Sequence, residues 1–420
     1  MKKLLVILIL FIGIFGYAQE TNTSYKKRVL EASELDMLFS YYSQDGQNAA
    51  VSGGEGTEEL TDATSTLVLK MPLNEDDVLT IDVGVSAYTS ASSSNINPFD
   101  GRGVANPFSA SSGASRSDVL AYFNPSYSHS SDDRNKVWRV KAYVSSEYDY
   151  FSIGFGGSYA YLFNEKNTEI SLSAQAFLDS WNPQYPVELR GGFENNVIGY
   201  TPVFTRFENE GRNSYSASLN FSQILSKRLQ GSLSVDVVAQ NGLLSSPFQR
   251  VYFGDVEDFF VEDFQLADDV ERLPENRFKI PIGARLNYYV NDFVVLRSYY
   301  RLYFDDWGIT SHTASLEAPI KLSDSFTLYP TYRYYTQTAA NDFFAKEEAL
   351  STFEFYTSDF DLSSYNSSQY GFGFQYKDIF TKTKLFFFGL KTVDLRYSYY
   401  DRSNGLNASI FTLGTTFIID

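Results

Sequence analysis

Two histidines, a turn rich in serine and aspartate, and charged residues at alternate positions are the features of this chain that could do chemistry. The chain has no cysteine, which excludes thiol nucleophiles, disulfides and iron–sulfur clusters. Two histidines are too few for a multi-histidine metal site or a haem pair. His129 precedes Ser130, Ser131, Asp132 and Asp133, which supply the residue types of a Ser-His-Asp triad.

The wider sequence does not favour an enzyme. It contains no Gly-x-Ser-x-Gly motif and no strand–turn–helix pattern that could hold one. We therefore expect a hydrophilic turn after His129 and an interfacial position for His312. Gly154, Gly156 and Gly157 lie within a strand pattern, so we expect them to make room for a bulky neighbour rather than to bind phosphate. We expect no cofactor.

Charged residues at every second position form the candidate site. If the apolar residues between them face lipid, the charged ones line the interior of a barrel. A basic arc on one wall would bias passage toward anions or acidic solutes. Alternatively, both signs pair with each other and with tyrosine hydroxyls to brace the wall, which the mixture of signs favours. The candidates are Arg139, Lys141, Lys279, Arg285, Arg297, Arg301, Glu317, Lys321, Arg333, Asp394 and Arg396.

One long segment, 241–277, is acidic and could bind a hard cation through Asp255, Glu257 and Asp258. It lacks the regularly spaced acidic residues of a calcium loop, so a solvated acidic loop is the favoured interpretation. Its phenylalanines do not suit a purely solvated loop, and they suggest a plug that folds inward or a docking surface. They are Phe253, Phe259, Phe260 and Phe264.

The elements that would position these residues are strands. Over Thr80–Thr89, apolar and polar residues alternate, which places successive side chains on opposite faces. The same pattern recurs sixteen times, in an all-β, up-and-down antiparallel barrel that spans a membrane. The predicted strands lie near 35–44, 61–71, 78–90, 118–129, 137–147, 150–163, 168–181, 213–225, 229–240, 278–290, 293–305, 309–321, 325–337, 367–377, 389–401 and 406–419.

The connections alternate in length. Tight turns such as Asn291-Asp292 alternate with long segments at 91–117, 182–212, 241–277 and 338–366. Short periplasmic turns and long outer loops are typical of outer-membrane barrels. Tyrosine and phenylalanine cluster at the strand ends, where an amphipathic ring is most stable.

The N-terminus predicts export. Lys2 and Lys3 precede an apolar run that is too short to span a membrane, so we expect a cleaved signal peptide at 1–18. A periplasmic segment at 19–34 and a barrel domain at 35–420 would follow, in the cell outer membrane. Removal of the two lysines changes the net charge from −17 to −19, which argues against nucleic acid and anionic lipid as partners. The expected partners are outer-membrane lipid and the barrel-assembly machinery.

Several blocks of the chain resemble a domain-of-unknown-function family of bacterial outer-membrane β-barrel proteins, common in Bacteroidetes-type and some proteobacterial genomes. The blocks are 41–46, 52–58, 85–94, 128–135, 311–313 and 333–340. The resemblance implies a single-domain barrel and carries no functional residue over. It also implies gene neighbours that include a small lipoprotein, a thioredoxin-like protein and a flavin transferase, which suggests a lipoprotein partner and envelope redox processes.

Two functions remain open from the sequence. The first is a pore or binding channel that passes small solutes through a charged lumen, since a barrel of this size is wide enough for water. The second is a plugged scaffold that docks a periplasmic or lipoprotein partner. An outer-membrane hydrolase is disfavoured by the missing motifs.

Overall fold

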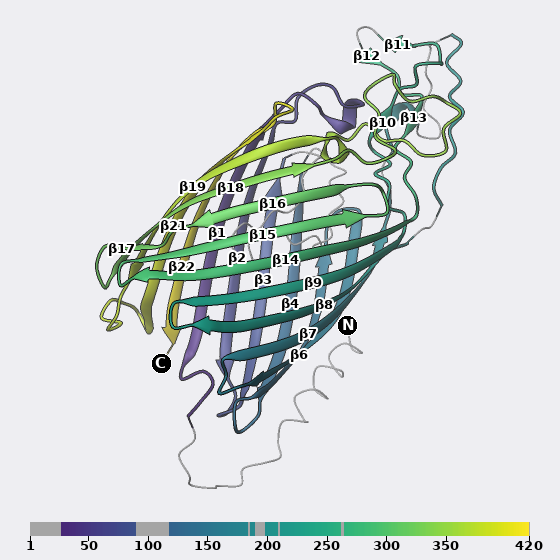
Figure 1. The fold of residues 1–420 in the computed structure, drawn as a ribbon. Helices are drawn as coiled ribbons and strands as arrows, with labels where there is room; N and C mark the ends of the chain where they lie inside the picture. Colours follow the sequence, from purple (N-terminus) through teal and green to yellow (C-terminus); the bar gives the residue numbers. More distant parts are fainter. Residues whose placement is uncertain are drawn as a thin grey trace, which may run out of the picture.

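The protein forms a closed antiparallel β-barrel (Figure 1). The computed structural model describes residues 27–89, 117–183, 185–189, 198–208, 211–261 and 264–419. The expected signal peptide 1–18, part of the expected segment 19–34 and nearly all of loop 91–117 lie outside the described residues. No helix among the described residues is long and apolar enough to cross a membrane.

Sixteen strands make up the wall, as the alternation predicts. The sheet contains eighteen segments, but β17 (Ile320–Lys321) continues β16 beyond Pro319, and β20 (Lys384–Leu385) only extends one turn. The strands are β1 (Ser33–Asp45), β2 (Leu60–Pro72), β3 (Asp77–Tyr88), β4 (Asp118–Ser130), β5 (Lys136–Ser146), β6 (Tyr150–Phe163), β7 (Thr168–Trp181), β8 (Gly211–Ser226), β9 (Leu229–Gly242), β14 (Asn276–Asn291), β15 (Val294–Asp305), β16 (Thr310–Glu317), β18 (Phe326–Gln337), β19 (Tyr365–Lys377), β21 (Phe388–Arg402) and β22 (Asn407–Ile419).

The first and last strands close the barrel. β1 pairs with β22 from Ser33↔Ile419 to Asp45↔Asn407, so the barrel wall that the structure describes has no open edge strand. The predicted strand ends agree with the observed ones to within two residues. One strand, predicted to run unbroken over 309–321, is interrupted before Ile320, because Pro319 has no amide hydrogen to donate to the ladder.

The outer surface of the wall is apolar. Along β21, Leu395, Tyr397 and Tyr399 are exposed, while the intervening Arg396 and Ser398 point to the other face. The same alternation leaves large apolar side chains exposed on neighbouring strands, and such a surface is stable only against lipid. Examples are Phe39, Leu67, Val85, Phe123, Val140, Phe155, Leu172, Leu219, Val235, Leu286, Tyr300, Tyr332 and Phe372.

The longest connections all lie at one end of the barrel, although 147–149, 306–309 and 403–406 at that end are short. At the turn end, the connections are mostly two to five residues long, as in the turn 227–228 between β8 and β9. At the loop end, the connection 243–275 contains four further short strands, β10 (Arg250–Val251), β11 (Phe260–Val261), β12 (Phe264–Gln265) and β13 (Asp269–Val270). The sequence predicts the long loop but not these strands, which project beyond the barrel wall (Figure 1).

Two glycines of β6 create space inside the wall. A Cβ atom at Gly154 would lie 2.7 Å from the ring of Phe177, and one at Gly156 would lie 2.8 Å from the side chain of Lys141. The Phe177 ring also packs edge-on against Tyr143, so it has little room to move. This geometry agrees with the sequence interpretation that these glycines accommodate bulky neighbours.

We expect Gly154→Ala to destabilise the barrel by about 1–3 kcal/mol, because the added methyl group overpacks the contact with Phe177. The measurement is the temperature at which the compact electrophoretic form is lost in detergent. Gly157→Ala is the matched control, since its Cβ would meet only Arg139 O at an ordinary 3.5 Å. Equal midpoints for the two variants would contradict the packing role of Gly154.

Candidate lumen wall and loop lid

Four of the predicted charged residues form one network on the inner wall. Glu317 accepts hydrogen bonds from Arg297 Nη1 at 2.8 Å and from Arg396 Nη1 at 3.2 Å. Arg396 Nε also donates to Asp394 at 2.7 Å. Two positive and two negative charges therefore neutralise each other, as expected of a brace.

The Arg396–Glu317 contact identifies the inner face directly. β18 and β19 separate the strands that carry these residues. Strands at this separation are about 14 Å apart along the wall, at roughly 4.8 Å between neighbours. Side chains can bridge that span only on the concave side, where they converge, and so the face that carries Arg396 is the inside of the barrel.

Three more arginines of the inner face lie over tyrosine rings. The guanidinium of Arg285 is 4.9 Å from the ring centre of Tyr299. The corresponding distances are 5.9 Å from Arg301 to Tyr303 and 6.0 Å from Arg333 to Tyr335. Cation–π contacts hold a positive charge without neutralising it. Arg301 and Arg333 therefore form a basic arc along β15 and β18, beside the neutral network.

The remaining predicted wall residues are dispersed. Lys279 lies opposite Asp305 in the β14–β15 register, next to the ion pair of Asp305 with Arg277. Lys321 lies at the turn end, where it pairs with Asp324. Arg139 and Lys141 lie on β5, in register with Ser158 and Gly156 of β6, away from the arc.

Four loops meet at the loop end and form a structure that we call the lid. It comprises the described residues of 46–59, 182–208, 243–275 and 338–364. These loops start from strands distributed around the barrel, so their contacts with each other place the lid over its mouth. The loops pack through small apolar clusters that include Phe248, Tyr252, Phe253 and Tyr356. The adjoining strand ends and the turn after β15 contribute Tyr150, Trp181 and Trp307 to these clusters.

Arg250 joins three of the lid loops. Its guanidinium binds the Glu188 carboxylate through Nε at 2.7 Å and Nη2 at 3.1 Å. Its Nη1 donates to Val51 O at 2.8 Å. The Glu188 side chain is 1% exposed. Its burial raises the pKa of Glu188, but hydrogen bonds and charge from Arg250 outweigh that effect and hold the pKa below its ordinary value.

Two carboxyl groups lie where the third and fourth lid loops meet, and of these Glu271 is buried and Asp359 is half-buried. Glu271 accepts hydrogen bonds from Ser246 N at 2.7 Å and from the Thr357 hydroxyl. Burial, together with the nearby charge of Asp359, raises the pKa of Glu271 to about 8. Asp359 accepts a hydrogen bond from Gln249 Nε2 at 3.3 Å, and burial raises its pKa as well. The closed lid therefore encloses one carboxyl group, that of Glu271, which is mostly protonated at neutral pH because its pKa is about 8.

The three acidic residues proposed from the sequence as weak cation ligands do not come together. Asp255 accepts hydrogen bonds from the amide and the hydroxyl of Ser351, each at 2.8 Å, and thus fixes one lid loop to another. Asp258 accepts one from Gln265, and Glu257 is exposed. Of the phenylalanines of this loop, Phe253 is buried against Tyr356 and Phe259 contacts Tyr200, whereas Phe260 is exposed.

A different acidic group lies at the loop end and was missed by sequence analysis. Carboxylate oxygens of Asp118, Glu147 and Asp149 lie within 4.8 Å of one another, a spacing that suits a hard cation. Tyr88 OH donates to Glu147 at 2.8 Å, and Trp181 Nε1 donates to Asp149 at 3.3 Å. Only the β4–β5 register brings Asp118 to the others, so no local sequence pattern marks this group.

The residues around His129 do not assemble a catalytic triad. His129 Nδ1 lies 2.6 Å from Asp77 Oδ1, whereas the Ser131 hydroxyl donates to Asp133 at 2.6 Å. The serine therefore caps its own turn, as the sequence interpretation expects. His312 is exposed on the outer face and lies 2.7 Å from Tyr300 OH.

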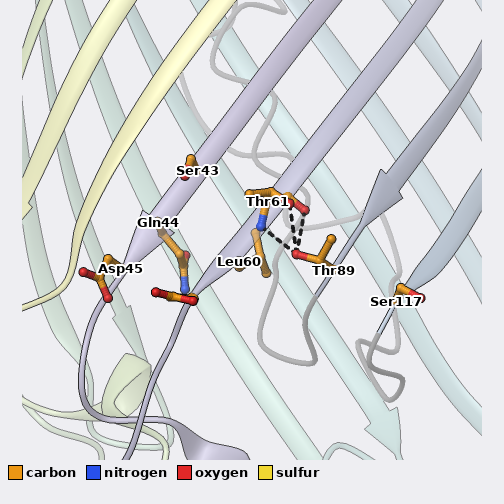
Figure 2. A pocket seen from close by; sticks show the side chains of 8 residues that line it. Ser43, Gln44, Asp45, Leu60, Thr61, Thr89 and Ser117 are labelled. Atoms are coloured by element: carbon orange, nitrogen blue, oxygen red, sulfur yellow. Dashed lines mark hydrogen bonds between the residues drawn. The ribbon is translucent and has the colours of Figure 1, made fainter.

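A shallow polar pocket of about 490 Å³ lies at the loop end, between the ends of β1, β2, β3 and β4. Figure 2 shows Thr61 and Thr89 hydrogen-bonded at its wall, with Gln44 and Asp45 beside them. Ser117, at the end of the undescribed segment, completes the lining. The pocket offers hydroxyl and amide groups together with the carboxylates of Asp45 and Glu59.

Comparisons with solved structures give barrels of low similarity. The chain is similar to a bacterial polysaccharide outer membrane secretin at 11% identity, with 93% of this chain and 99% of that chain covered and a TM-score of 0.46. It is also similar to a BenF-like porin from Pseudomonas fluorescens Pf-5 at 8% identity, with 93% of this chain and 100% of that chain covered and a TM-score of 0.42. The similarity to OccK1 from Pseudomonas aeruginosa is 8% identity, with 92% of this chain and 98% of that chain covered and a TM-score of 0.38.

No curated protein matches the chain. Residues 12–415 match the model of a family described as a protein of unknown function, DUF3570. That match spans nearly the whole sequence and agrees with the resemblance that the sequence motifs indicate. The protein therefore belongs to the DUF3570 family.

Proposed function

We propose that this protein is an outer-membrane channel for small acidic solutes, closed at its outer mouth by the lid. The apolar exterior supports a membrane location, with the loop end outside the cell and the turn end in the periplasm. The observation that carries the function is the basic arc of Arg301 and Arg333. These charges are held against tyrosine rings on the inner face, and their positive charge stays available to a solute.

The neutral network has a different part in this proposal. Arg297, Arg396, Glu317 and Asp394 balance each other, so they stiffen the wall and contribute little net field. In this proposal, each of the two interpretations from the sequence applies to its own set of residues. The arc selects solutes, and the network braces the barrel.

We expect Arg301→Ala with Arg333→Ala to lower the preference for anions. A unit charge about 10 Å from a permeating ion contributes roughly 0.4 kcal/mol in water, so loss of two should lower the anion-to-cation permeability ratio by roughly fourfold or more. The measurement is the reversal potential in a salt gradient, made on a variant with an open lid. Lys321→Gln is the matched control, since Lys321 already pairs with Asp324 at the rim. An unchanged reversal potential in the double variant would overturn the assignment of the arc.

The second candidate is a plugged scaffold that presents its lid or its periplasmic end to a partner such as a small lipoprotein. The interlocked lid favours it, because apolar clusters and buried ion pairs cost free energy to separate. Conductance of the purified protein in a planar bilayer distinguishes the two. A channel conducts once its lid is released, whereas a plugged scaffold stays silent with the lid closed or open.

A further inference from the structure

The connection between β19 and β21 differs from the other described turns at its end of the barrel. It occupies residues 378–387, whereas the other turns leave two to five residues between strands. Within it, β20 pairs with the start of β21 through Lys384↔Gly389 and Leu385↔Phe388. The chain thus forms an additional hairpin, which we call the 378–388 hairpin. A turn that only reverses the chain direction would not need this length.

The hairpin exposes an unusual amount of apolar surface. Phe380 is 75% exposed, Phe386 89% and Phe387 63%. Ile379 and Leu385 are also exposed. Contiguous apolar surface of this kind marks a site of contact with a membrane or another molecule, because its exposure to water is unfavourable.

The exposed side chains continue the apolar exterior of the barrel. The ring of Phe387 lies 4.1 Å from that of Phe388, which in turn meets Phe417 of β22 at 6.0 Å. On β18 and β19, Phe326 contacts Phe374 and Tyr376 on the outer face. The hairpin tip therefore joins the belt that faces lipid.

The charges of the hairpin are positive, in contrast to the net charge of −17 of the chain. Lys382 and Lys384 lie within it, and Lys382 Nζ is 5.2 Å from the ring centre of Phe380. The one carboxylate, Asp378, accepts a hydrogen bond from Thr383 N at 2.8 Å. Lysines beside apolar side chains suit a surface of anionic headgroups above hydrocarbon.

We propose that the 378–388 hairpin is a membrane anchor that inserts Leu385, Phe386 and Phe387 into the periplasmic leaflet. Lys382 and Lys384 bind the phosphate groups of anionic phospholipids there. The occupant is lipid rather than protein, because the patch is continuous with the lipid-facing belt and carries the complementary charge. The inference rests on the membrane location proposed above and is independent of any transport activity.

The absence of cysteine allows a direct test, since a single introduced cysteine can be labelled uniquely. We would attach a nitroxide to Phe386→Cys in the full barrel, reconstituted in vesicles of phosphatidylethanolamine and phosphatidylglycerol. Accessibility to oxygen and to a water-soluble nickel chelate then reports depth. Phe372→Cys on the outer face of β19 is the lipid control, and Lys227→Cys in the exposed β8–β9 turn is the water control.

An anchor requires the label at 386 to match the one at 372, accessible to oxygen and shielded from nickel. Accessibility to nickel equal to that at 227 would overturn the anchor, and so would shielding from both reagents, which indicates packing against protein. If the label at 372 is in lipid while that at 386 is in water, only the anchor fails. If both are in water, the membrane location itself fails.

The lysines are tested separately. Lys382→Gln with Lys384→Gln should move the label at 386 toward water in vesicles that contain phosphatidylglycerol. The same pair of substitutions should have little effect in vesicles of phosphatidylcholine alone, which carry no net charge. Equal effects in both vesicles would overturn the headgroup contact.

Discussion

Replacement of Arg250 by alanine should release the lid and convert a closed barrel into a conducting one. Arg250 holds Glu188 and Val51 O together from three different loops. Its loss would leave the Glu188 carboxylate buried without its counter-charge, and removing one partner of such a pair costs about 3–5 kcal/mol. A free-energy change of that size is enough to displace loops that meet through small apolar clusters.

The measurement is single-channel conductance of the reconstituted protein in symmetric salt. We expect rare openings from the unchanged protein and steady openings of the order of a nanosiemens from Arg250→Ala, as befits a wide aqueous barrel. Limited proteolysis of the lid loops should accelerate in parallel. Arg250→Lys, which keeps the charge but loses the bidentate contact, should lie between the two.

Lys346→Ala is the matched control for the lid. Lys346 also joins two lid loops, through Glu55 at 3.0 Å, but Glu55 is 66% exposed. Exposed ion pairs contribute only about 0–1 kcal/mol, so this variant should stay closed. If Arg250→Ala is well folded and its lid loops are cleaved rapidly but the barrel remains silent, the channel proposal fails and the scaffold is favoured.

The barrel could be predicted from the sequence because the pattern that specifies each strand involves residues that are close together in the chain. Residues two apart on a strand share a face, so the run from Ile81 to Ala87 already separates the lipid side from the inside. Closure follows from the even number of strands, which lets Ser33 meet Ile419. The inward position of Arg396 and Glu317 follows from the same alternation. The alternation does not predict which residues these two side chains contact. Their contact depends on the curvature of the wall across two intervening strands.

The lid could not be predicted, because its contacts join residues that no periodicity relates. Arg250 and Glu188 are distant in sequence and lie in irregular segments. The local signal was the set of phenylalanines in the acidic loop, of which Phe253 is now buried. That signal indicates a packed loop but cannot show which loop it packs against. Asp118 and Glu147 illustrate the same limit, since only strand register brings them together.

Closure of the lid should weaken as the pH rises, and Glu271 should be the main cause. Burial holds the pKa of Glu271 at about 8, above its ordinary value of 4.5. Below about 4.5 the carboxyl is protonated whether the lid is closed or displaced, so closure is unopposed. Between these values a displaced lid exposes an ionised carboxylate while a closed lid retains the proton. The free energy that favours the closed lid therefore decreases as the pH rises from about 4.5 to about 8, and it does not decrease further above about pH 8.

The size of this effect follows from the shift, since one pKa unit corresponds to about 1.4 kcal/mol and the full shift to roughly 5 kcal/mol. Asp359 adds to it in the same direction, because burial raises its pKa too. The other charged groups close to the pair are Asp361, which opposes its ionisation, and Arg212 and Arg402, which favour it. Acidic solution should therefore keep the lid closed.

Acrylamide quenching of Trp181 and Trp307, which pack against residues of the lid, measures the closure in a Trp138→Phe background, together with conductance. We expect quenching and openings to increase from about pH 5 to about pH 9. Glu271→Gln should flatten most of that increase, because an amide stays neutral throughout. Asp255→Asn is the matched control, since Asp255 is exposed and hydrogen bonds from Ser351 hold its pKa below the ordinary value, outside this window. Glu271 is not the switch if its glutamine variant retains the full pH response.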